Sequence, residues 1–165
     1  MNKTLLLLFA LAAAPAQADW SLVVGAGGGD GADRLSLGAE WQQPAPWFES
    51  DSGQFDYGLW FDSSYWELGD DELVQLSLVP TLYYATHADG LRPFAFVGVG
   101  PAWISQTRLE QRRFSTQFQF SSRVGVGVAL ARHSLALEGG HLSNAGIARP
   151  NDGLTSWGVS YRYNF

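Results

Sequence analysis

The sequence predicts an all-β protein, an eight-stranded antiparallel transmembrane β-barrel, and three observations support this fold class. First, apolar and polar residues alternate with a period of two in segment after segment, whereas helical periodicity is rare. Second, aromatic residues make up 14% of the chain and charged residues only 16%, below the roughly 25% usual for soluble domains. Third, no segment beyond the N-terminal region approaches the roughly 18 unbroken apolar residues of a spanning helix, so any membrane crossing must use strands.

Residues 1–18 are predicted to form a secretory signal peptide that is absent from the mature protein. A basic start with Lys3 precedes the apolar run 5–14, and Ala16 and Ala18 form a small-residue cleavage site. The run is too short for a membrane-spanning helix. We therefore expect a signal peptide over 1–18 and a barrel over 19–165. The alternative for the first part is a buried N-terminal helix.

The charge and the absence of cysteine exclude several classes of function. Cleavage after Ala18 leaves nine arginines, no lysine and sixteen carboxylates, and therefore a net charge near −7. An acidic chain without a basic stripe is not expected to bind nucleic acid. The chain has no cysteine, which excludes disulfides, thiolate metal sites and cysteine nucleophiles.

Eight segments show the alternation, and turns rich in glycine, proline or polar residues separate them. In the clearest segment, 117–130, valine and phenylalanine face one way and glutamine, serine, arginine and glycine the other. Segment 92–104 is apolar on both faces, which leaves its orientation open. Strands of about ten residues can cross a bilayer at a tilt. The eight segments are 20–26, 34–41, 55–62, 75–84, 92–104, 117–130, 135–138 and 156–165.

The two faces of these segments favour a membrane barrel over a soluble, lipocalin-like periplasmic carrier. The polar face has serine, glycine and glutamine with isolated charges, whereas a solvent-exposed exterior normally has many lysines and glutamates. The final Tyr-x-Tyr-x-Phe, ending at Phe165, resembles the C-terminal signature of outer-membrane barrels. Aromatic residues at strand ends match the girdles of such barrels. They are Trp20, Trp41, Tyr84, Tyr161 and Tyr163.

An eight-stranded barrel is filled by its own side chains, so no pore is expected. The charged residues on the polar face are predicted to form a paired network inside. They are Arg34, Glu40, Asp56, Arg123, Glu138 and Arg162. Because a signal peptide delivers the N-terminus from the periplasm, odd-numbered segments run outward, and the first, third, fifth and seventh loops face the cell exterior.

His141 and Ser143, near the end of the seventh segment, are the residues that suggest chemistry. They are two apart, so on a strand both point to the side that carries Leu135 and Leu137, which faces lipid. Polar groups there are costly unless the substrate is itself a lipid of the outer leaflet. Ser143 would attack an ester carbonyl, with His141 as the base that later returns the proton. Taken alone, His-x-Ser is a weak signal for catalysis, because many barrels have such residues at the interface, where they hydrogen-bond to headgroups or neighbouring strands.

Backbone N–H groups in the turn that follows the serine could stabilise the oxyanion. The candidates are those of Asn144, Ala145 and Gly146.

The longer string at 141–153, His-x-Ser-Asn-Ala-Gly-Ile-x-x-Pro-Asn-Asp-Gly, closely resembles that of the PagL-type lipid A 3-O-deacylases of Gram-negative bacteria. The likeness extends over nearly the whole mature chain, and includes Trp41, the Tyr-Trp-Glu-x-Gly stretch at 65–69, and the Arg-Pro-Phe that begins at Arg92. The resemblance implies an eight-stranded outer-membrane barrel that hydrolyses the ester of the 3-position acyl chain of lipid A. It also implies lipopolysaccharide as the partner, no metal or organic cofactor, and a homodimer in some members.

By the same resemblance, His141 is the catalytic histidine, Ser143 the nucleophile and Asn144 the motif asparagine. The family places a glutamate two residues after the last glycine of the string, where it orients the histidine; here that position is Thr155. Strand parity sets Thr155 beside His141, but its hydroxyl cannot stabilise imidazolium by charge. The loss of such an acid lowers kcat by about 10⁴-fold in a serine protease.

Two carboxylates could stand in for the missing acid. We favour Asp152, in the mobile loop, over a Ser-His dyad, and a dyad over Glu138, which faces the lumen unless the strand has a bulge. Arg108, Arg112 and Arg113 lie in the loop over 105–116, where they would either bind the phosphates of lipid A or be solvated. The alternative function is a weakened or non-catalytic small barrel with a lipid-binding or structural role.

Overall fold

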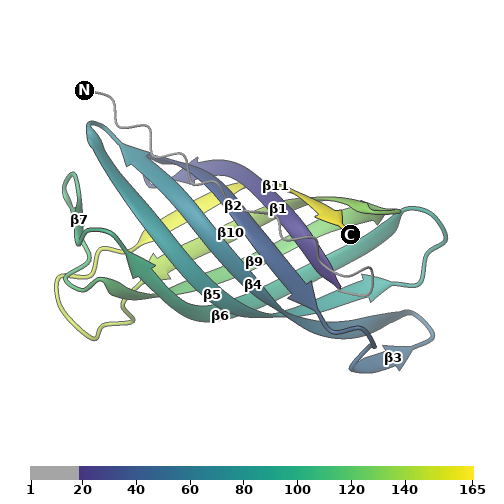
Figure 1. The fold of residues 1–165 in the computed structure, drawn as a ribbon. Coiled ribbons are helices and arrows are strands. Elements are labelled where there is room, and N and C mark those ends of the chain that lie inside the picture. Colours follow the sequence, from purple (N-terminus) through teal and green to yellow (C-terminus); the bar gives the residue numbers. More distant parts are fainter. Residues whose placement is uncertain (1–18) are drawn as a thin grey trace.

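The computed structural model describes residues 19–165, and in it eight long antiparallel strands form a closed barrel (Figure 1). Neighbours in sequence pair along the sheet, β1 also pairs with β11, and β2 pairs with β4, so the cylinder has no seam. The all-β, eight-stranded prediction is confirmed, whereas the predicted signal peptide lies outside the described residues. The strands are β1 (Trp20–Gly29), β2 (Ala32–Gln42), β4 (Gly53–Leu68), β5 (Asp71–Thr86), β6 (Arg92–Ile104), β9 (Phe118–Leu130), β10 (His133–Ser143) and β11 (Leu154–Asn164).

Three short strands lie outside the cylinder wall, in loops for which the sequence predicted no regular structure. β3 (Phe48–Ser50) pairs with the start of β4. β7 (Arg108–Leu109) and β8 (Arg112–Arg113) form a two-stranded hairpin of their own. Figure 1 shows β7 beyond one end of the barrel and β3 beyond the other. We call these the hairpin end and the terminal end, because β1 begins and β11 ends at the latter.

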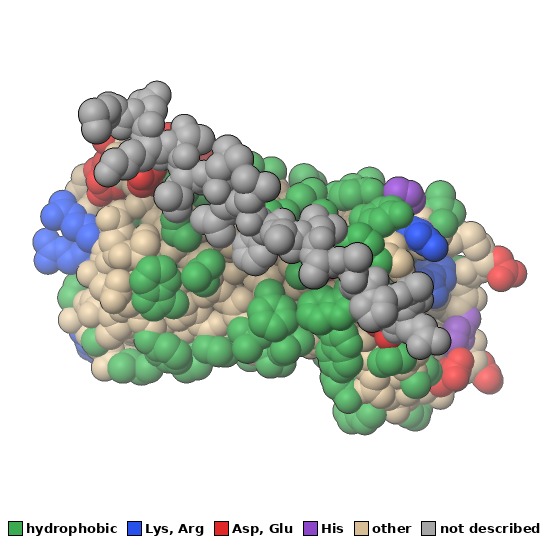
Figure 2. Space-filling model, viewed as in Figure 1, with side chains coloured by type: hydrophobic (Ala, Val, Ile, Leu, Met, Phe, Trp, Pro, Cys, Tyr) green, Lys and Arg blue, Asp and Glu red, His purple; other side chains and the backbone are tan. Residues whose placement is uncertain are grey.

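The eight strands have 10 to 16 residues each, enough to cross a bilayer, which takes about 9–11 at a tilt. Along each strand, exposed apolar side chains alternate with buried ones, and the apolar exterior is visible in Figure 2. In β6, which the sequence left ambiguous, Val97 and Val99 are exposed, while Phe96, Ala102 and Ile104 are buried. No helix in residues 19–165 is long and apolar enough to span a membrane.

Three arginines and three carboxylates form a charged layer in the lumen, and their formal charges balance. Arg34 contacts Asp62 at 3.3 Å and Glu138 at 3.5 Å. The layer continues through Arg123, whose Nη2 lies 3.4 Å from Glu138. Arg123 also contacts Glu40, which in turn pairs with Arg162. This layer corrects one expectation. Asp56 is not part of it, because its carboxylate accepts a bond from Gln54, and the buried Asp62 takes the expected place.

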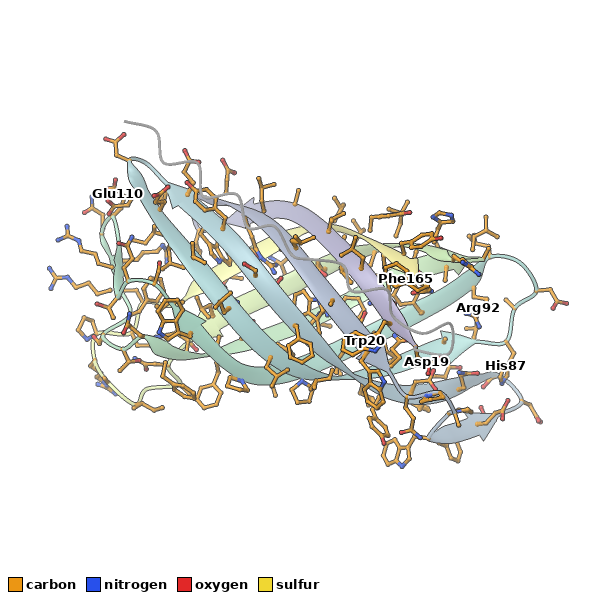
Figure 3. The ribbon with its side chains drawn as sticks, viewed as in Figure 1. Asp19, Trp20, His87, Arg92, Glu110 and Phe165 are labelled. Carbon is orange, nitrogen blue, oxygen red and sulfur yellow. The ribbon has the colours of Figure 1, made fainter. Side chains whose placement is uncertain are left out.

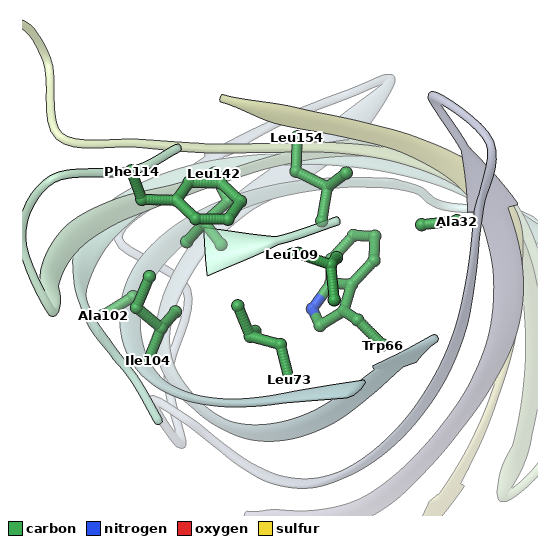
Figure 4. Packing of buried hydrophobic residues seen from close by; sticks show 9 residues of the cluster. All are labelled: Ala32, Trp66, Leu73, Ala102, Ile104, Leu109, Phe114, Leu142 and Leu154. Carbon is green, nitrogen blue, oxygen red and sulfur yellow. The ribbon is translucent and has the colours of Figure 1, made fainter. Parts of the chain in front are cut away.

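An apolar cluster fills the lumen at the hairpin end (Figure 4). The hairpin contributes Leu109, and the chain just after it contributes Phe114; both side chains are 0% exposed. They pack on residues that point inward from the surrounding strands, which are Ala32, Trp66, Leu73, Ala102, Ile104, Leu142 and Leu154. These contacts therefore hold the hairpin over the mouth of the barrel.

Candidate active site

His141 and Thr155 face each other across the β10–β11 pair on the outer wall of the barrel. The two residues are partners in the strand register, as predicted from strand parity. Their neighbours Leu142 and Leu154 are buried in the lumen, so the imidazole, which is exposed, points outward. His141 Nδ1 lies 2.9 Å from Thr155 Oγ1, a hydrogen-bond distance that fixes the orientation of the ring.

Ser143 ends β10 two residues beyond His141, on the same side of the strand. Residues two apart on a strand are about 6.6 Å apart along the chain, so both side chains can approach one reacting atom. Within residues 19–165, the hydrogen bonds join His141 to Thr155 but not to Ser143. Catalytic hydrogen bonds are often long without substrate and shorten when it binds.

The turn after Ser143 has a backbone conformation that orders its N–H groups. Ala145 and Gly146 have φ values of 54° and 83°, and Ile147 N–H donates to Asn144 O at 3.1 Å, as in a type I′ turn. Asn144 is fully buried; its Nδ2 donates to Phe114 O and Ala148 O, and its Oδ1 accepts from Gly146 N–H. The Asn144 side-chain amide thus stabilises the conformation of this loop.

One of the three expected oxyanion donors remains unengaged. Asn144 N–H bonds to Asn151 Oδ1 at 3.1 Å, and Gly146 N–H bonds to the Asn144 side chain. Among the hydrogen bonds of the described part of the chain, Ala145 N–H takes part in none. The N–H of Ala145 is therefore the backbone group available to a substrate oxygen.

Neither carboxylate expected to replace the family glutamate contacts the imidazole. Asp152 Oδ2 accepts from Arg113 N–H at 2.7 Å, and Asp152 N–H donates to Arg113 O, which ties this residue to β8. Glu138 is in the lumen with Arg34 and Arg123. The structure thus departs from the preference for Asp152 as partner of His141, because two bonds to a backbone hold Asp152 elsewhere.

The three arginines of the hairpin loop have different surroundings. Arg108 Nε donates to Glu110 O at 2.7 Å, and the side chains of Arg108 and Arg113 are exposed. Arg112 is instead bonded to Gly153 O and to Asp30, so its guanidinium is engaged within the protein. Of the expected phosphate ligands, Arg108 and Arg113 remain accessible.

Two residues that the sequence did not single out also belong to the site. Gly153, with φ of 63°, lies directly against the imidazole, since a Cβ added there would be 2.8 Å from His141 Cε1. Asp30 Oδ2 accepts from Thr155 N–H at 2.7 Å. Gly153 is the last glycine of the 141–153 string, and that was its signal in the sequence. The signal for Asp30 was topological, because the turn after the first strand must lie beside the start of the last strand in a closed barrel.

A groove of about 780 Å³ begins at His141 and Thr155 and crosses the outer wall. It runs obliquely over six strands to Tyr57, near the terminal end of β4. The groove therefore extends from His141 toward the terminal end of the barrel. The Trp157 ring covers Gly139, where any side chain would collide with it. Apolar side chains form much of the groove wall: Tyr57, Leu82, Val97, Val99, Val124 and Trp157.

A membrane-type barrel with an imidazole and hydroxyls beside an external apolar groove defines the class, a surface hydrolase of lipid esters. The comparisons identify the family. The model of the lipid A 3-O-deacylase (PagL) family matches residues 33–164. The lipid A deacylase PagL of Pseudomonas aeruginosa is 35% identical over 149 residues, covering 88% of this chain and 85% of that protein. The lipid A deacylase PagL of Bordetella bronchiseptica is 30% identical over 177 residues, covering 99% and 97%.

A solved structure supports the same assignment. The crystal structure of the outer membrane enzyme PagL superposes with a TM-score of 0.83 at 28% identity, covering 88% of this chain and 99% of that one. The chain belongs to the lipid A 3-O-deacylase family. The predicted family, the bacterial outer-membrane barrel and the ester-hydrolase class are confirmed.

Proposed function

We propose that this chain removes the 3-O-linked acyl chain of lipid A, with Ser143 as nucleophile and His141 as general base. The observation that carries the proposal is the position of the His141–Thr155 pair, which is on the outer wall at the head of the apolar groove. A lipid substrate can reach such a pair without leaving the membrane.

The first half of the reaction forms an acyl-enzyme. Thr155 Oγ1 accepts the hydrogen on His141 Nδ1, which leaves Nε2 unprotonated and able to accept the Ser143 hydroxyl proton. Ser143 Oγ then bonds to the ester carbonyl carbon, and the N–H of Ala145 donates to the developing oxyanion. The carbon–oxygen bond to lipid A breaks as Nε2 returns the proton to the departing alcohol.

The second half releases the fatty acid. Nε2 removes a proton from water as the water oxygen attacks the acyl carbon, and Ser143 Oγ leaves with that proton. The released chain is the one that lies in the groove beneath His141. All of these residues come from one chain, so the mechanism does not require the homodimer that the resemblance allows.

The hairpin end faces the outer leaflet in this proposal. Arg108 and Arg113, exposed there, are the guanidinium groups that would bind the phosphates of lipid A as charged forks. Asp152 supports the site indirectly, since it ties the loop after Ser143 to Arg113.

Mass spectrometry of lipid A from cells that express the chain tests the proposal. We expect loss of one 3-hydroxy acyl chain with the unaltered protein, and an intact profile with Ser143→Ala and with His141→Ala. Heat-modifiable migration on gels controls for folding of each variant. An unaltered lipid A profile with the folded, unsubstituted protein would favour the non-catalytic alternative. Activity retained by Ser143→Ala would refute the assignment of Ser143 as the nucleophile.

A further inference from the structure

The segment 153–155 presents two surfaces to the His141 ring. Thr155 Oγ1 bonds to Nδ1, and the Gly153 backbone packs against Cε1 and Nε2, where an added Cβ would lie 2.8 and 3.2 Å away. Any displacement of this segment therefore moves the imidazole. Catalysis is sensitive to such shifts, because misplacing a reacting group by about 1 Å can lower the rate about 100-fold.

Asp30 holds one end of this segment from the β1–β2 turn, on the other side of β11. The β1–β11 ladder has Gly28 opposite Trp157 as its last pair, and continuing the register would place residue 30 opposite Thr155. At Asp30 the backbone turns away toward β2, with φ of 55°. Its carboxylate takes over the ladder position and accepts the Thr155 N–H at 2.7 Å.

Arg112 holds the other end and fixes Asp30 at the same time. Its Nη1 donates to Gly153 O at 3.2 Å, and its Nη2 donates to Asp30 O at 3.0 Å. The same Nη2 lies 3.6 Å from Asp30 Oδ1. A closed set of contacts thus joins the β1–β2 turn, the β7–β8 hairpin and the start of β11.

We propose that Asp30 and Arg112 are positioning residues that hold segment 153–155 and thereby aim the His141 imidazole at Ser143. The inference rests on the Ser143–His141 mechanism proposed above. Asp30 acts as a hydrogen-bond acceptor in this arrangement, and its charge is balanced by Arg112. The pair therefore supplies geometry, not the negative charge that the family glutamate would provide.

Kinetics of Asp30 variants test the proposal, with kcat and KM measured separately on purified lipid A in detergent. Asp30→Ala removes the acceptor, and we expect kcat to fall about 10- to 100-fold with KM within about twofold. Asp30→Asn retains an acceptor oxygen and should recover most of kcat. Arg112→Met releases Gly153 and should lower kcat in the same way.

Ser105→Ala is the matched control. Ser105 Oγ also accepts a backbone N–H at the hairpin end, from Val74 at 3.0 Å, but this contact does not involve β10, β11 or the β7–β8 hairpin. We expect kcat within about twofold of the unsubstituted protein. A loss equal to that of Asp30→Ala would overturn the proposal, because any loosened loop would then suffice.

Nuclear magnetic resonance of the His141 ring gives a readout that needs no turnover. In a Ser143→Ala background, the His141 signals are assigned by their loss in His141→Ala. Adding Asp30→Ala should shift and broaden them, and Asp30→Asn should leave them nearly unchanged. This measurement also covers the case in which a variant is too inactive for kinetics.

Besides an equal loss in the control, three results from the Asp30 variants would overturn the inference. The first is an Asp30→Ala protein with unaltered kcat and unaltered His141 signals, and the second is a rise in KM alone, which would indicate substrate contact. The third is an equal loss in Asp30→Ala and Asp30→Asn. Activity retained by Ser143→Ala would instead refute the proposed mechanism, and the ring signals would still report on the Asp30–Arg112 pair.

Discussion

His141 Nδ1 bonds to the hydroxyl of Thr155, in the place where the family resemblance implies a glutamate. A hydroxyl can select the ring tautomer, but it cannot stabilise the imidazolium that forms during proton transfer. Thr155→Glu should therefore raise the rate of fatty-acid release from lipid A by at least about tenfold. Initial rates with purified protein measure this.

Thr155→Gln is the control for that change, since it has the length of glutamate without the charge, and it should give no such gain. Equal rates for the glutamate and glutamine variants would mean that charge at this position does not limit the reaction.

The contact between Gly153 and the imidazole gives a second prediction. Gly153→Ala adds a methyl group 2.8 Å from His141 Cε1, and should lower activity by about 10-fold or more by displacing the ring. Gly90→Ala is a matched control, because Gly90 also has positive φ, at 82°, but an added Cβ meets nothing within 4 Å. Both variants share the backbone strain, so a comparable loss of activity in both would exclude the contact as the cause.

The sequence could predict some of these residues and not others, for physical reasons. The period-two geometry of strands fixes which side chains share a face, so Thr155, a position marked by the family resemblance, could be placed on the same face as His141. Asp152 is in a loop and Arg112 in the two-residue strand β8, where turns with positive φ and contacts from distant segments decide the direction of each side chain. Asp30 depends on barrel closure, which brings together residues 125 positions apart.

Among the elements, the β7–β8 hairpin is held by two buried side chains, Leu109 within it and Phe114 just after it. Phe114 is 0% exposed, and its carbonyl oxygen accepts from Asn144 Nδ2 at 2.8 Å. This bond links the apolar cluster at the hairpin end to the loop after Ser143. Phe114→Ala should lower the unfolding free energy by about 3–5 kcal/mol and reduce activity as well. Urea unfolding in detergent, followed by heat-modifiable migration, measures the first effect.

Phe118→Ala is the comparison for this prediction, because Phe118 is 47% exposed on the outer wall and is not part of the apolar cluster. It should shift the urea midpoint much less. Equal shifts would contradict the role of Phe114 as a core residue.

The eight long strands were predictable because each buries one face and exposes the other to hydrocarbon. The hairpin was not, since its strands have two residues each and show no period. The sequence could predict which charged side chains face the lumen, but not which of them pair. It therefore indicated Asp56, whereas in the structure Asp62 pairs with Arg34. Which carboxylate meets an arginine depends on the stagger between strands, and turn signals in the sequence do not fix it to one residue.

At the scale of the whole molecule, the barrel is built in layers along its axis. The apolar cluster fills the hairpin end, and the charged layer fills the middle. Tyr83 and Phe96 pack together in the lumen on the side of the terminal end. Arg123 contacts both the charged layer and the aromatic residues, since its guanidinium lies over the rings of Trp60 and Phe96. The Cζ atom is 3.7 Å from the centroid of the Trp60 ring and 4.2 Å from that of Phe96. The interior is thus occupied by side chains, and the groove that begins at His141 lies on the outer wall.

We predict that the hairpin end of the barrel faces the cell exterior, and the absence of cysteine makes this orientation simple to measure. Figure 3 shows Glu110, in the β7–β8 turn, at one end of the barrel and His87 at the other. Gln111 directly follows Glu110, Asp89 lies two residues after His87, and both are exposed. In intact cells, a membrane-impermeant maleimide should label Gln111→Cys but not Asp89→Cys, and both should react after the outer membrane is disrupted. The reverse pattern would place the His141 groove entrance at the periplasmic leaflet, away from the lipid A of the outer leaflet, and would refute the proposed access of substrate from the exterior.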